Sequence, residues 1–588
     1  MDRNSIIGFV LIALLLFAYF TWFAPSPEVV KQPLITDSLI VKPQEKEIAI
    51  QPEQKTDSIF TQTANIKEEL VTLENADIRI SFSNKGAVIR EAELKNYKTY
   101  SKKPLVLVTP SRSRFNLTGA VNGKPVDLYQ AMYSYRTDNI GDSSRIEFKT
   151  SSELTGEVKH IYTLAKTGYQ LQYRVVAPGI NSENLTFSWF NRLPLVEKDI
   201  NDSRSKTTVN YYSTTGEFDG ISESSQDEER EDIPASKWIS VKQKFFLSAF
   251  LTKKSFSGGS MTTSVDPADS STVKTAAFSV KIPTADVNSG TGNFSFYLGP
   301  NDYKTLNSVA DDFRQNVDLG WPPVNLVNKY FIVPVFQLLT QYLNSYWLII
   351  TLMVLLIRVI LFPLSYKSYL GMAKMRLLKP ELDVLKKQHE GDQVKFSQEQ
   401  MKLFNEAGAS PFSGCIPLLL QMPFLFAMFF LFPACIEFRQ QTLLFADDIS
   451  TYDSVLSFAF TIPFLGNHLS VYTLLMTLST LVITWQNNQI TTVDGPMKSM
   501  SYIMPVIFLF VLNSFPASLS FYYLVSNVVS FAQQILIKRF VDEDKIKKVM
   551  DAHRLKQASS TSKKSTFMSK LEGAMKASEE ARKKNKRN

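Results

Sequence analysis

The stretch Leu355-Leu-Ile-Arg-Val-Ile-Leu-Phe-Pro-Leu364 places an arginine inside one of the most apolar parts of the chain. It lies within a run of 18 residues, Trp347 to Leu364, in which Arg358 is the only charged side chain. A run of this length and composition predicts a helix that spans the hydrocarbon core of a membrane, which is about 30 Å thick. A guanidinium near the centre of such a helix costs at least about 2.5 to 3.5 kcal/mol. We therefore expect Arg358 to face protein, water or lipid headgroups.

Five more apolar runs accompany this one. They are Ile6 to Phe23, Ile416 to Ile436, Leu469 to Trp485, Tyr502 to Phe515 and Leu519 to Ile537. The first is expected to be an uncleaved anchor, because Trp-Phe-Ala before Pro25 is a poor cleavage site for a signal peptidase. The run from Tyr502 is short, so we expect it to extend back toward Met497 or to cross a thinned bilayer. Together the runs predict a polytopic α-helical membrane protein with six transmembrane helices.

The basic residues predict the orientation of these helices. Between residues 366 and 410 the chain has eight lysines and arginines, whereas between 437 and 468 it has only Arg439. Loops rich in Lys and Arg stay on the cytosolic side of a membrane. Six spans then place both termini in the cytoplasm, and they place the segment after the first span in the periplasm of a cell with an inner membrane.

The segment after the first span changes character along its length. Residues 24 to 60 are rich in Pro, Gln, Lys and Glu without an apolar period, which predicts a disordered linker. From 61 to 320, stretches such as Asp77-Ile-Arg-Ile-Ser-Phe82 alternate polar and apolar residues between turn-forming Asn, Gly and Pro. This rhythm predicts a periplasmic β-sandwich domain. The other expected domains are an N-terminal anchor at 1 to 23, an interfacial helix at 321 to 344, a five-helix core at 345 to 537 and a basic tail at 538 to 588.

Between the β domain and the second span, apolar residues recur at helical spacing. They are Val327, Phe331, Val335, Leu338 and Tyr342. Such a one-sided pattern fits an amphipathic helix at the bilayer surface, or an ordinary helix that covers the β domain. The position directly before a span favours the interfacial helix.

The basic loop from 366 to 410 has a helical pattern of its own. Its apolar positions are Met375, Leu378, Leu382, Leu385, Val394, Met401 and Phe404. Gly391 offers a turn between the two halves and Pro380 a kink or a boundary, so we expect an antiparallel helical hairpin. The tail from 538 to 588 carries 16 basic and 7 acidic residues. It is expected to contact anionic lipid or RNA phosphates, or to remain a solvated arm.

Polar side chains recur within the predicted spans. One face of the sixth span carries Ser520, Tyr523, Asn527, Ser530 and Gln534, and the third span carries Gln421. Such residues can simply hydrogen-bond neighbouring helices. Because the spans contain Arg358 but no Asp or Glu to neutralise it, we favour a hydrated cavity that opens to the cytosol. Snorkelling of Arg358 to the cytosolic headgroups is the alternative.

Motifs of enzymes and of cofactor sites are missing from the sequence. The chain lacks the G-x-x-x-x-G-K-[ST], H-E-x-x-H and G-x-S-x-G patterns. Its two cysteines, Cys415 and Cys435, lie at opposite ends of one predicted span and cannot form a bridge within it. Its four histidines lack ligand spacing and are expected at the surface. We therefore expect no catalytic residue, no cofactor and no metal.

Several stretches, in this order along residues 345 to 537, resemble the YidC membrane protein insertases of the Oxa/Alb superfamily. They are Leu356-Ile-Arg-Val-Ile-Leu-Phe-Pro-Leu364, Gly371-Met-Ala-Lys-Met-Arg376, Pro411-Phe-Ser-Gly-Cys-Ile-Pro-Leu-Leu-Leu-Gln-Met-Pro423, Met504-Pro-Val-Ile-Phe508 and Tyr522-Tyr-Leu-Val-Ser-Asn527. The β domain, with Trp238 to Leu251 and Leu298-Gly-Pro300, resembles the periplasmic domain of the Gram-negative branch.

The resemblance implies a five-helix core around a hydrophilic groove that opens to the cytosol. Arg358 and Gln421 match groove-lining residues of the family, and Tyr522 and Tyr523 match a tyrosine pair near the periplasmic end of the last helix. The expected groove and substrate-binding residues are Arg358, Gln421, Ser520, Tyr522, Tyr523, Asn527, Ser530 and Gln534. One departure is Val354, where relatives can carry a threonine. Groove polarity is then lower at this point, or Thr351 supplies it.

These observations predict a membrane protein insertase and chaperone without an enzymatic step. Nascent membrane proteins enter the groove, Arg358 attracts their hydrophilic or acidic parts, and the hydrophobic effect moves the new helix into lipid. The partners that the resemblance implies are nascent membrane proteins, the ribosome at the cytosolic loops and tail, the Sec translocon and the phospholipid bilayer. Two alternatives stay open: a transporter with a polar cavity, and a membrane-anchored periplasmic module that binds glycans.

Overall fold

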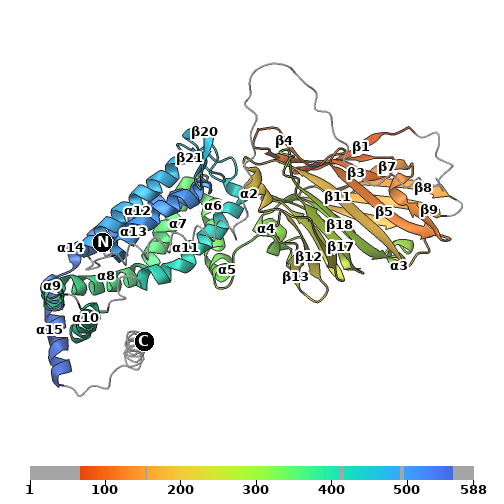
Figure 1. The fold of residues 1–588 in the computed structure, drawn as a ribbon. Coiled ribbons are helices and arrows are strands. Elements are labelled where there is room, and N and C mark those ends of the chain that lie inside the picture. The colour runs from red at the N-terminus through yellow and green to blue at the C-terminus, as the bar shows by residue number, and fades with distance from the viewer. Residues whose placement is uncertain (1–66, 153–154, 391, 411–415, 491–495, 560–588) are drawn as a thin grey trace, which may run out of the picture.

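The computed structural model describes residues 67–152, 155–390, 392–410, 416–490 and 496–559. A β-sheet part and a helical part lie side by side, and the helical part follows the β-sheet part in sequence (Figure 1). Several predicted features lie outside the described residues: the anchor at 1 to 23, the linker at 24 to 60, the turn at Gly391 and the tail from 560 to 588.

Three antiparallel sheets make up the described β-sheet part. The first has the strand order β1-β2-β3-β4, with β1 (Leu70–Glu74), β2 (Ile78–Ser83), β3 (Val88–Lys98) and β4 (Pro104–Val108). The second has the order β14-β17-β18-β11-β5-β6, with β5 (Ser113–Val121), β6 (Lys124–Asp127), β11 (Asn184–Pro194), β14 (Glu229–Ile233), β17 (Gly259–Ser264) and β18 (Thr272–Pro283). The third has the order β13-β12-β15-β16-β19-β10-β9-β8-β7, with β7 (Ser134–Ile140), β8 (Ser143–Ser152), β9 (Gly156–Ala165), β10 (Gln170–Val176), β12 (Thr208–Ser213), β13 (Phe218–Gly220), β15 (Ser236–Lys242), β16 (Phe246–Phe256) and β19 (Phe294–Pro300).

Alternating side chains bring the two larger sheets together. In β11, Leu185, Phe187 and Trp189 are buried, and the residues between them are partly exposed. Successive side chains of a strand point to opposite faces, so this pattern gives β11 one apolar face. Phe187 stacks on Phe250 of β16, with 4.1 Å between the ring centroids. The two sheets therefore share an aromatic core, in the region where the alternation predicts a β domain.

His160 of β9 lies inside this core, although the sequence predicts a surface position for it. Its Nδ1 lies 2.8 Å from the Tyr173 hydroxyl and its Nε2 lies 3.0 Å from the Tyr133 hydroxyl, and the ring is fully buried. The prediction is wrong here because the two partners, Tyr133 directly before β7 and Tyr173 in β10, are brought to His160 by the fold and not by local sequence. His468 is also buried, so the predicted surface position is wrong for it as well. For His160, burial lowers the pKa to about 3.

Acidification is therefore expected to destabilise the β domain through His160. An unfolded histidine has a pKa of about 6.5, whereas that of folded His160 is about 3. As the pH falls, the unfolded state takes up the proton first. The stability linked to neutral His160 is present above about pH 6.5 and is lost below it, by about 2 kcal/mol between pH 7 and pH 5. Urea unfolding of the wild type and of His160→Gln measures this; an equal pH dependence in both proteins would contradict it.

The helices begin within the β-sheet part and then form a separate bundle. The short ones are α2 (Ile200–Arg204), α3 (Thr284–Asn288), α4 (Tyr303–Leu306) and α5 (Val324–Val327). The others are α6 (Val333–Tyr342), α7 (Tyr346–Ile360), α8 (Phe362–Leu377), α9 (Lys379–Gln388), α10 (Gln393–Glu406), α11 (Ile416–Ala434), α12 (Val471–Ile490), α13 (Pro496–Leu512), α14 (Ala517–Phe540) and α15 (Glu543–Ser559). A two-stranded hairpin, β20 (Leu456–Ile462) and β21 (Gly466–Leu469), precedes α12.

The second predicted span is broken close to Arg358. α7 ends at Ile360 and α8 begins at Phe362, with a bend of 61° between them. Pro363 lies in the first turn of α8 and has no N–H to continue the hydrogen bonds of α7. Arg358 therefore lies in the last turn of α7, not within one continuous helix from Trp347 to Leu364.

Length and apolar composition test the predicted spans. In the described ranges, no helix is by itself long and apolar enough to cross a membrane; α7 and α8 meet the requirement only as a bent pair. Gln421–Ala434 and Lys498–Leu512 are apolar but shorter. The count of six transmembrane helices therefore stays a prediction.

Helical turns fill the segment before α7, where the sequence predicts an amphipathic helix. α5 and α6 are joined by a π-helical turn, Asn328–Ile332. Its buried side chains Asn328 and Ile332 face the bundle, where the Asn328 amide donates to the Ala427 carbonyl of α11 at 3.0 Å. Leu338 and Tyr342 of the predicted apolar stripe are exposed. The segment thus packs on other helices and turns two large apolar side chains outward.

α8, α9, α10 and α15 meet at the end of the bundle that lies away from the β-sheet part (Figure 1). Pro380 lies in the first turn of α9, directly after α8. Leu378, Leu382 and Phe404 share a buried apolar cluster with Ile546 of α15. The apolar positions of the basic loop therefore pack against α15 as well as against each other.

Candidate functional site

The side chain of Arg358 joins three helices. From α7, its guanidinium donates to the amide oxygen of Gln421 in α11 at 3.3 Å. It also donates to Ser526 of α14, at 2.6 Å to the hydroxyl oxygen and at 3.2 Å to the carbonyl oxygen. We call Arg358, Gln421 and Ser526 the arginine cluster.

Uncharged oxygens are the hydrogen-bond acceptors of Arg358. Its bonds in the described part of the chain go to an amide, a hydroxyl and a carbonyl, and it forms no ion pair there. The side chain is half-buried. Neutral dipoles compensate a partly desolvated cation less completely than a carboxylate does. The arginine cluster can therefore attract an acidic or strongly polar segment that comes within reach.

Ser526 is the member of the arginine cluster that the sequence does not single out. The predicted polar face of the sixth span follows Ser520, Tyr523 and Asn527, whereas Ser526 lies on the neighbouring face. A signal was present, because Tyr522, Ser526 and Ser530 are spaced four residues apart and share a face. The Ser530 hydroxyl donates to the Ser526 carbonyl at 2.6 Å, the same carbonyl that accepts from Arg358. Ser530 thus contacts the backbone of Ser526 and helps to hold the arginine cluster in place.

Three other predicted site residues bind α12 instead. The Ser520 hydroxyl lies 3.0 Å from the Thr473 hydroxyl. The Asn527 amide donates to Ser479 and Thr480 at 3.0 and 2.8 Å, and the Gln534 amide donates to Asn487 at 3.1 Å. These contacts are the hydrogen bonds between neighbouring helices that the sequence left as an alternative. The predicted polar face is therefore divided between the arginine cluster and the α12–α14 contact.

Tyr522 and Tyr523 lie on adjacent sides of α14. Tyr522 is buried and packs edge-on against Phe432 of α11, with 5.8 Å between the ring centroids. Tyr523 is partly exposed, and its ring meets that of Tyr522 at 5.6 Å. Near Arg358, Val354 is buried, and the Thr351 hydroxyl donates to the Trp347 carbonyl of its own helix at 2.8 Å. The hydroxyl hydrogen of Thr351 is therefore used within α7.

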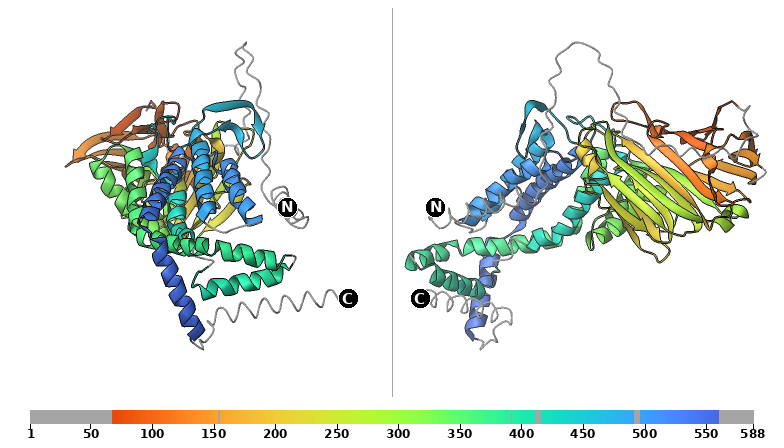
Figure 2. Two further views of the ribbon diagram at one scale, coloured as in Figure 1. Left: turned by 90° about the vertical axis from the view of Figure 1, so that its left-hand side faces the viewer. Right: turned by 45° about the vertical axis from the view of Figure 1, so that its right-hand side comes forward.

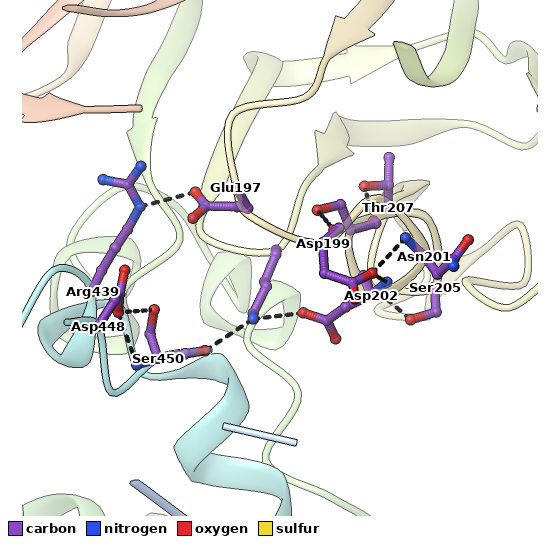
Figure 3. Close-up of polar contacts among 11 residues, drawn as sticks. Glu197, Asp199, Asn201, Asp202, Ser205, Thr207, Arg439, Asp448 and Ser450 are labelled. Atoms are coloured by element: carbon purple, nitrogen blue, oxygen red, sulfur yellow. Dashed lines mark hydrogen bonds and ion pairs between the residues drawn. The ribbon is translucent and has the colours of Figure 1, made fainter. Parts of the chain in front are cut away.

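A second polar cluster joins the β-sheet part to the helices (Figure 3). Arg439, which follows α11, donates to the Glu197 carboxylate at 2.9 Å, and both side chains are almost fully buried. Nearby, the Lys244 ammonium contacts Asp202 at 2.6 Å and donates to the Ser450 carbonyl at 3.2 Å. We call these five residues the interdomain cluster. It fixes the segment between α11 and α12 to the β-sheet part.

The arrangement of α2 orients one half of the interdomain cluster. Asp199 precedes α2, and its carboxylate accepts from the backbone N–H groups of Asn201 and Asp202. An Asp at this position satisfies N–H groups that lack partners within the helix. On the other side, the Asp448 carboxylate accepts from the Ser450 N–H at 2.9 Å (Figure 3). Each side of the interdomain cluster is thus held by its own local turn.

Comparison with protein families divides the chain into two matched parts. Residues 335–545 match the family described as 60Kd inner membrane protein. Residues 70–333 match the family described as YidC periplasmic domain. The boundary between the two matches falls within the helical segment that precedes α7.

Full-length relatives carry one shared name. A protein of Amoebophilus asiaticus named "Membrane protein insertase YidC" is 39% identical over 593 residues, which cover 98% of this chain and 99% of that protein. A protein of the same name from Cytophaga hutchinsonii is 41% identical over 609 residues, covering 99% and 98%. One from Parabacteroides distasonis is 32% identical over 635 residues, covering 99% and 98%. The similarity therefore extends through both parts of the chain.

Proposed function

The chain belongs to the YidC membrane protein insertases of the 60Kd inner membrane protein family, and on this basis we propose that its client segments contact the arginine cluster. The protein is a membrane protein insertase, and its function is not enzymatic. It is an inner membrane protein with a periplasmic domain, and nascent membrane proteins are its substrates. The comparisons therefore favour the insertase over the two alternatives that the sequence left open, a transporter and a glycan-binding module.

The hydrogen bonds of Arg358 carry the proposal. The cation is half-buried among helices α7, α11 and α14, and its acceptors are uncharged. A hydrophilic or acidic client segment that reaches Arg358 replaces weak neutral acceptors with stronger ones. It also crosses a shorter distance of low dielectric than it would in bare lipid. Binding at this point then lowers the barrier to transfer, and the apolar part of the client moves into the bilayer.

The proposed client-binding residues differ in their roles. They are Arg358, Gln421, Ser520, Tyr522, Tyr523, Asn527, Ser530 and Gln534. Arg358, Gln421 and Ser530 act at the arginine cluster, together with Ser526. Tyr523 offers an aromatic surface to the client. The buried Tyr522 ring contacts the Tyr523 ring and holds it in position. Ser520, Asn527 and Gln534 hold α14 on α12, so they preserve the wall of the site.

We also propose the topology and the further partners. Six helices cross the membrane, both termini are cytoplasmic, and the ribosome and the Sec translocon cooperate in insertion. The described elements of the basic loop support a cytosolic contact surface, because ion pairs fasten α15 to them. Arg376 of α8 pairs with Glu543, and Arg554 pairs with Glu381 of α9 at 2.8 Å. We infer that the basic tail contacts lipid or ribosomal RNA.

Site-specific photocrosslinking tests the client-binding residues. A crosslinker is placed at position 421 or 523, with position 359 as the control, because Val359 is 70% exposed on the outer side of α7. A stalled nascent chain of an inner membrane protein is expected to crosslink more strongly from 421 and 523 than from 359, because the proposed contact is localised at these two positions. Equal yields from all three positions would contradict the proposed site.

A further inference from the structure

The hairpin β20–β21 lies at the end of the bundle near the β-sheet part (Figures 1 and 2). It exposes several large apolar side chains. Val455, Leu456 and Phe460 are 55%, 54% and 64% exposed, and Phe464 at the turn is 68% exposed. Phe458 and Phe460 lie with their ring centroids 5.7 Å apart. An exposed apolar surface of this kind indicates an interaction site.

The composition of the hairpin limits what that surface can bind. From Ser454 to Leu469 the chain has no Asp, Glu, Lys or Arg, and its one titratable side chain, His468, is buried. A loop that meets water or a charged protein partner normally carries charges at its rim. The edge of this two-stranded sheet also lacks the charged residues that usually prevent pairing with other strands. An uncharged aromatic surface is instead suited to the interfacial region of a bilayer.

The hairpin is held firmly at its base. Asn513, between α13 and α14, is fully buried and donates to the carbonyls of Leu465 and His468 at 2.8 Å each. Its side-chain oxygen accepts from the Ser470 N–H at 2.9 Å. The His468 ring meets the Asn513 carbonyl at 3.1 Å and stacks on Tyr452 with 3.9 Å between the centroids. The exposed side chains therefore project from a fixed support.

The hairpin surface continues the outer surface of the neighbouring helices. Asn513 follows directly on α13, whose last turns expose Phe508, Phe510 and Val511. α12 starts two residues after β21 and exposes Leu478 and Val482. In an inner membrane protein, such outward apolar side chains of a helical bundle face lipid. The apolar outer surface thus extends from α12 and the last turns of α13 onto the hairpin, and no charged residue separates the hairpin from α12 in sequence.

We propose that β20–β21 is a membrane anchor that lies in the interfacial region of the outer leaflet. Leu456, Phe460 and Phe464 insert among the headgroups and the first acyl carbons, and the hairpin holds the outer ends of α12 and α13 at a fixed depth. This inference rests on the proposed topology, which places this end of the bundle at the periplasmic surface. It adds a lipid contact that is separate from the client-binding residues.

Depth-dependent quenching in proteoliposomes tests the anchor. Cys415 and Cys435 are replaced by alanine, and one new cysteine carries an environment-sensitive fluorophore. The test position is 460; position 482 in α12 and position 136 in β7 are controls, since Val482 and Arg136 are both exposed. The lipids carry a quencher either near the headgroup or deep in the acyl chain. We expect the headgroup quencher to act at 460, the deep quencher to act at 482, and neither to act at 136.

The controls separate the possible failures. If 482 is quenched and 460 behaves like 136, the anchor is overturned and the topology stands. If 482 is not quenched, the topology itself fails. A label at 460 that is shielded from water but insensitive to both quenchers would indicate a second copy of the chain, and would also overturn the anchor. With the label at Ala459, Phe460→Ser and Phe464→Ser together are expected to reduce headgroup quenching to the level of position 136.

Discussion

Replacing Arg439 with alanine is expected to lower the free energy of unfolding by about 3 to 5 kcal/mol, the cost of leaving a buried ionic partner unpaired. Arg439 and Glu197 are only 4% and 10% exposed at their side chains, and they meet at 2.9 Å. Without Arg439, the Glu197 carboxylate has lost its hydrogen-bonded cation but not its burial. Loss of this ion pair should also weaken the contact between the β-sheet part and the segment after α11.

The pH dependence of this variant has a definite sign. Burial already raises the pKa of Glu197, while Arg439 and Lys244 oppose that rise. Removing Arg439 raises the pKa further, so the folded state binds the proton more tightly than the unfolded state does. The stability of Arg439→Ala should therefore fall as the pH rises from the unfolded glutamate pKa of about 4.3. The difference from the wild type is then largest at neutral pH.

Urea unfolding of the purified full-length protein measures the change in the free energy of unfolding. In a second experiment, hydrogen exchange of residues 437 to 452 measures whether the contact with the β-sheet part has weakened. The matched control is the double variant Glu197→Leu with Arg439→Met, which removes both charges. It is expected to recover most of the loss, because buried ion pairs replaced by apolar residues are often neutral in stability. A change below about 0.5 kcal/mol in Arg439→Ala, the level of an ordinary surface substitution, would show that the ion pair does not hold the two parts together.

Local patterns explain how much of this fold was predictable. The alternation from Asp77 to Phe82, most of which forms β2, and the apolar runs of α7, α12 and α14 are properties of neighbouring residues, so they can be recognised without knowing the fold. The ion pair of Glu197 and Arg439 joins positions 242 residues apart. In the sequence, Arg439 stands out as the one basic residue between 437 and 468, and this scarcity of basic residues predicted the orientation of the helices. A helical or strand period cannot predict that Glu197 is its partner.

The candidate site was predictable to a similar extent. The cost of burying Arg358 demanded polar neighbours, and Gln421 is one of them. The spacing on α14 predicted a single polar face, yet α12 approaches one side of that helix and α7 the other. Asn527 therefore contacts Thr480, whereas Ser526 contacts Arg358. Which side meets which neighbour depends on packing, and a helical period does not contain that information.

The role of Arg358 makes the second large prediction. In Arg358→Ala, insertion of clients with acidic translocated segments is expected to slow by about tenfold, because a charge-assisted hydrogen bond contributes about 1.5 kcal/mol or more. Clients with uncharged translocated segments should change much less, since they gain little from a cation. Reconstituted proteoliposomes with matched clients that differ only in these acidic residues measure the two rates.

Two further variants separate charge from structure. Arg358→Lys keeps the charge but loses the forked geometry that reaches Gln421 and Ser526 together, so it should retain most of the preference for acidic clients. Ser526→Ala removes the 2.6 Å contact and leaves the charge, so its effect should be similar for both kinds of client. Equal insertion of acidic clients by Arg358→Ala and the wild type would contradict an electrostatic role. Equal loss for both clients would make Arg358 a packing residue, because only a charge distinguishes substrates by charge.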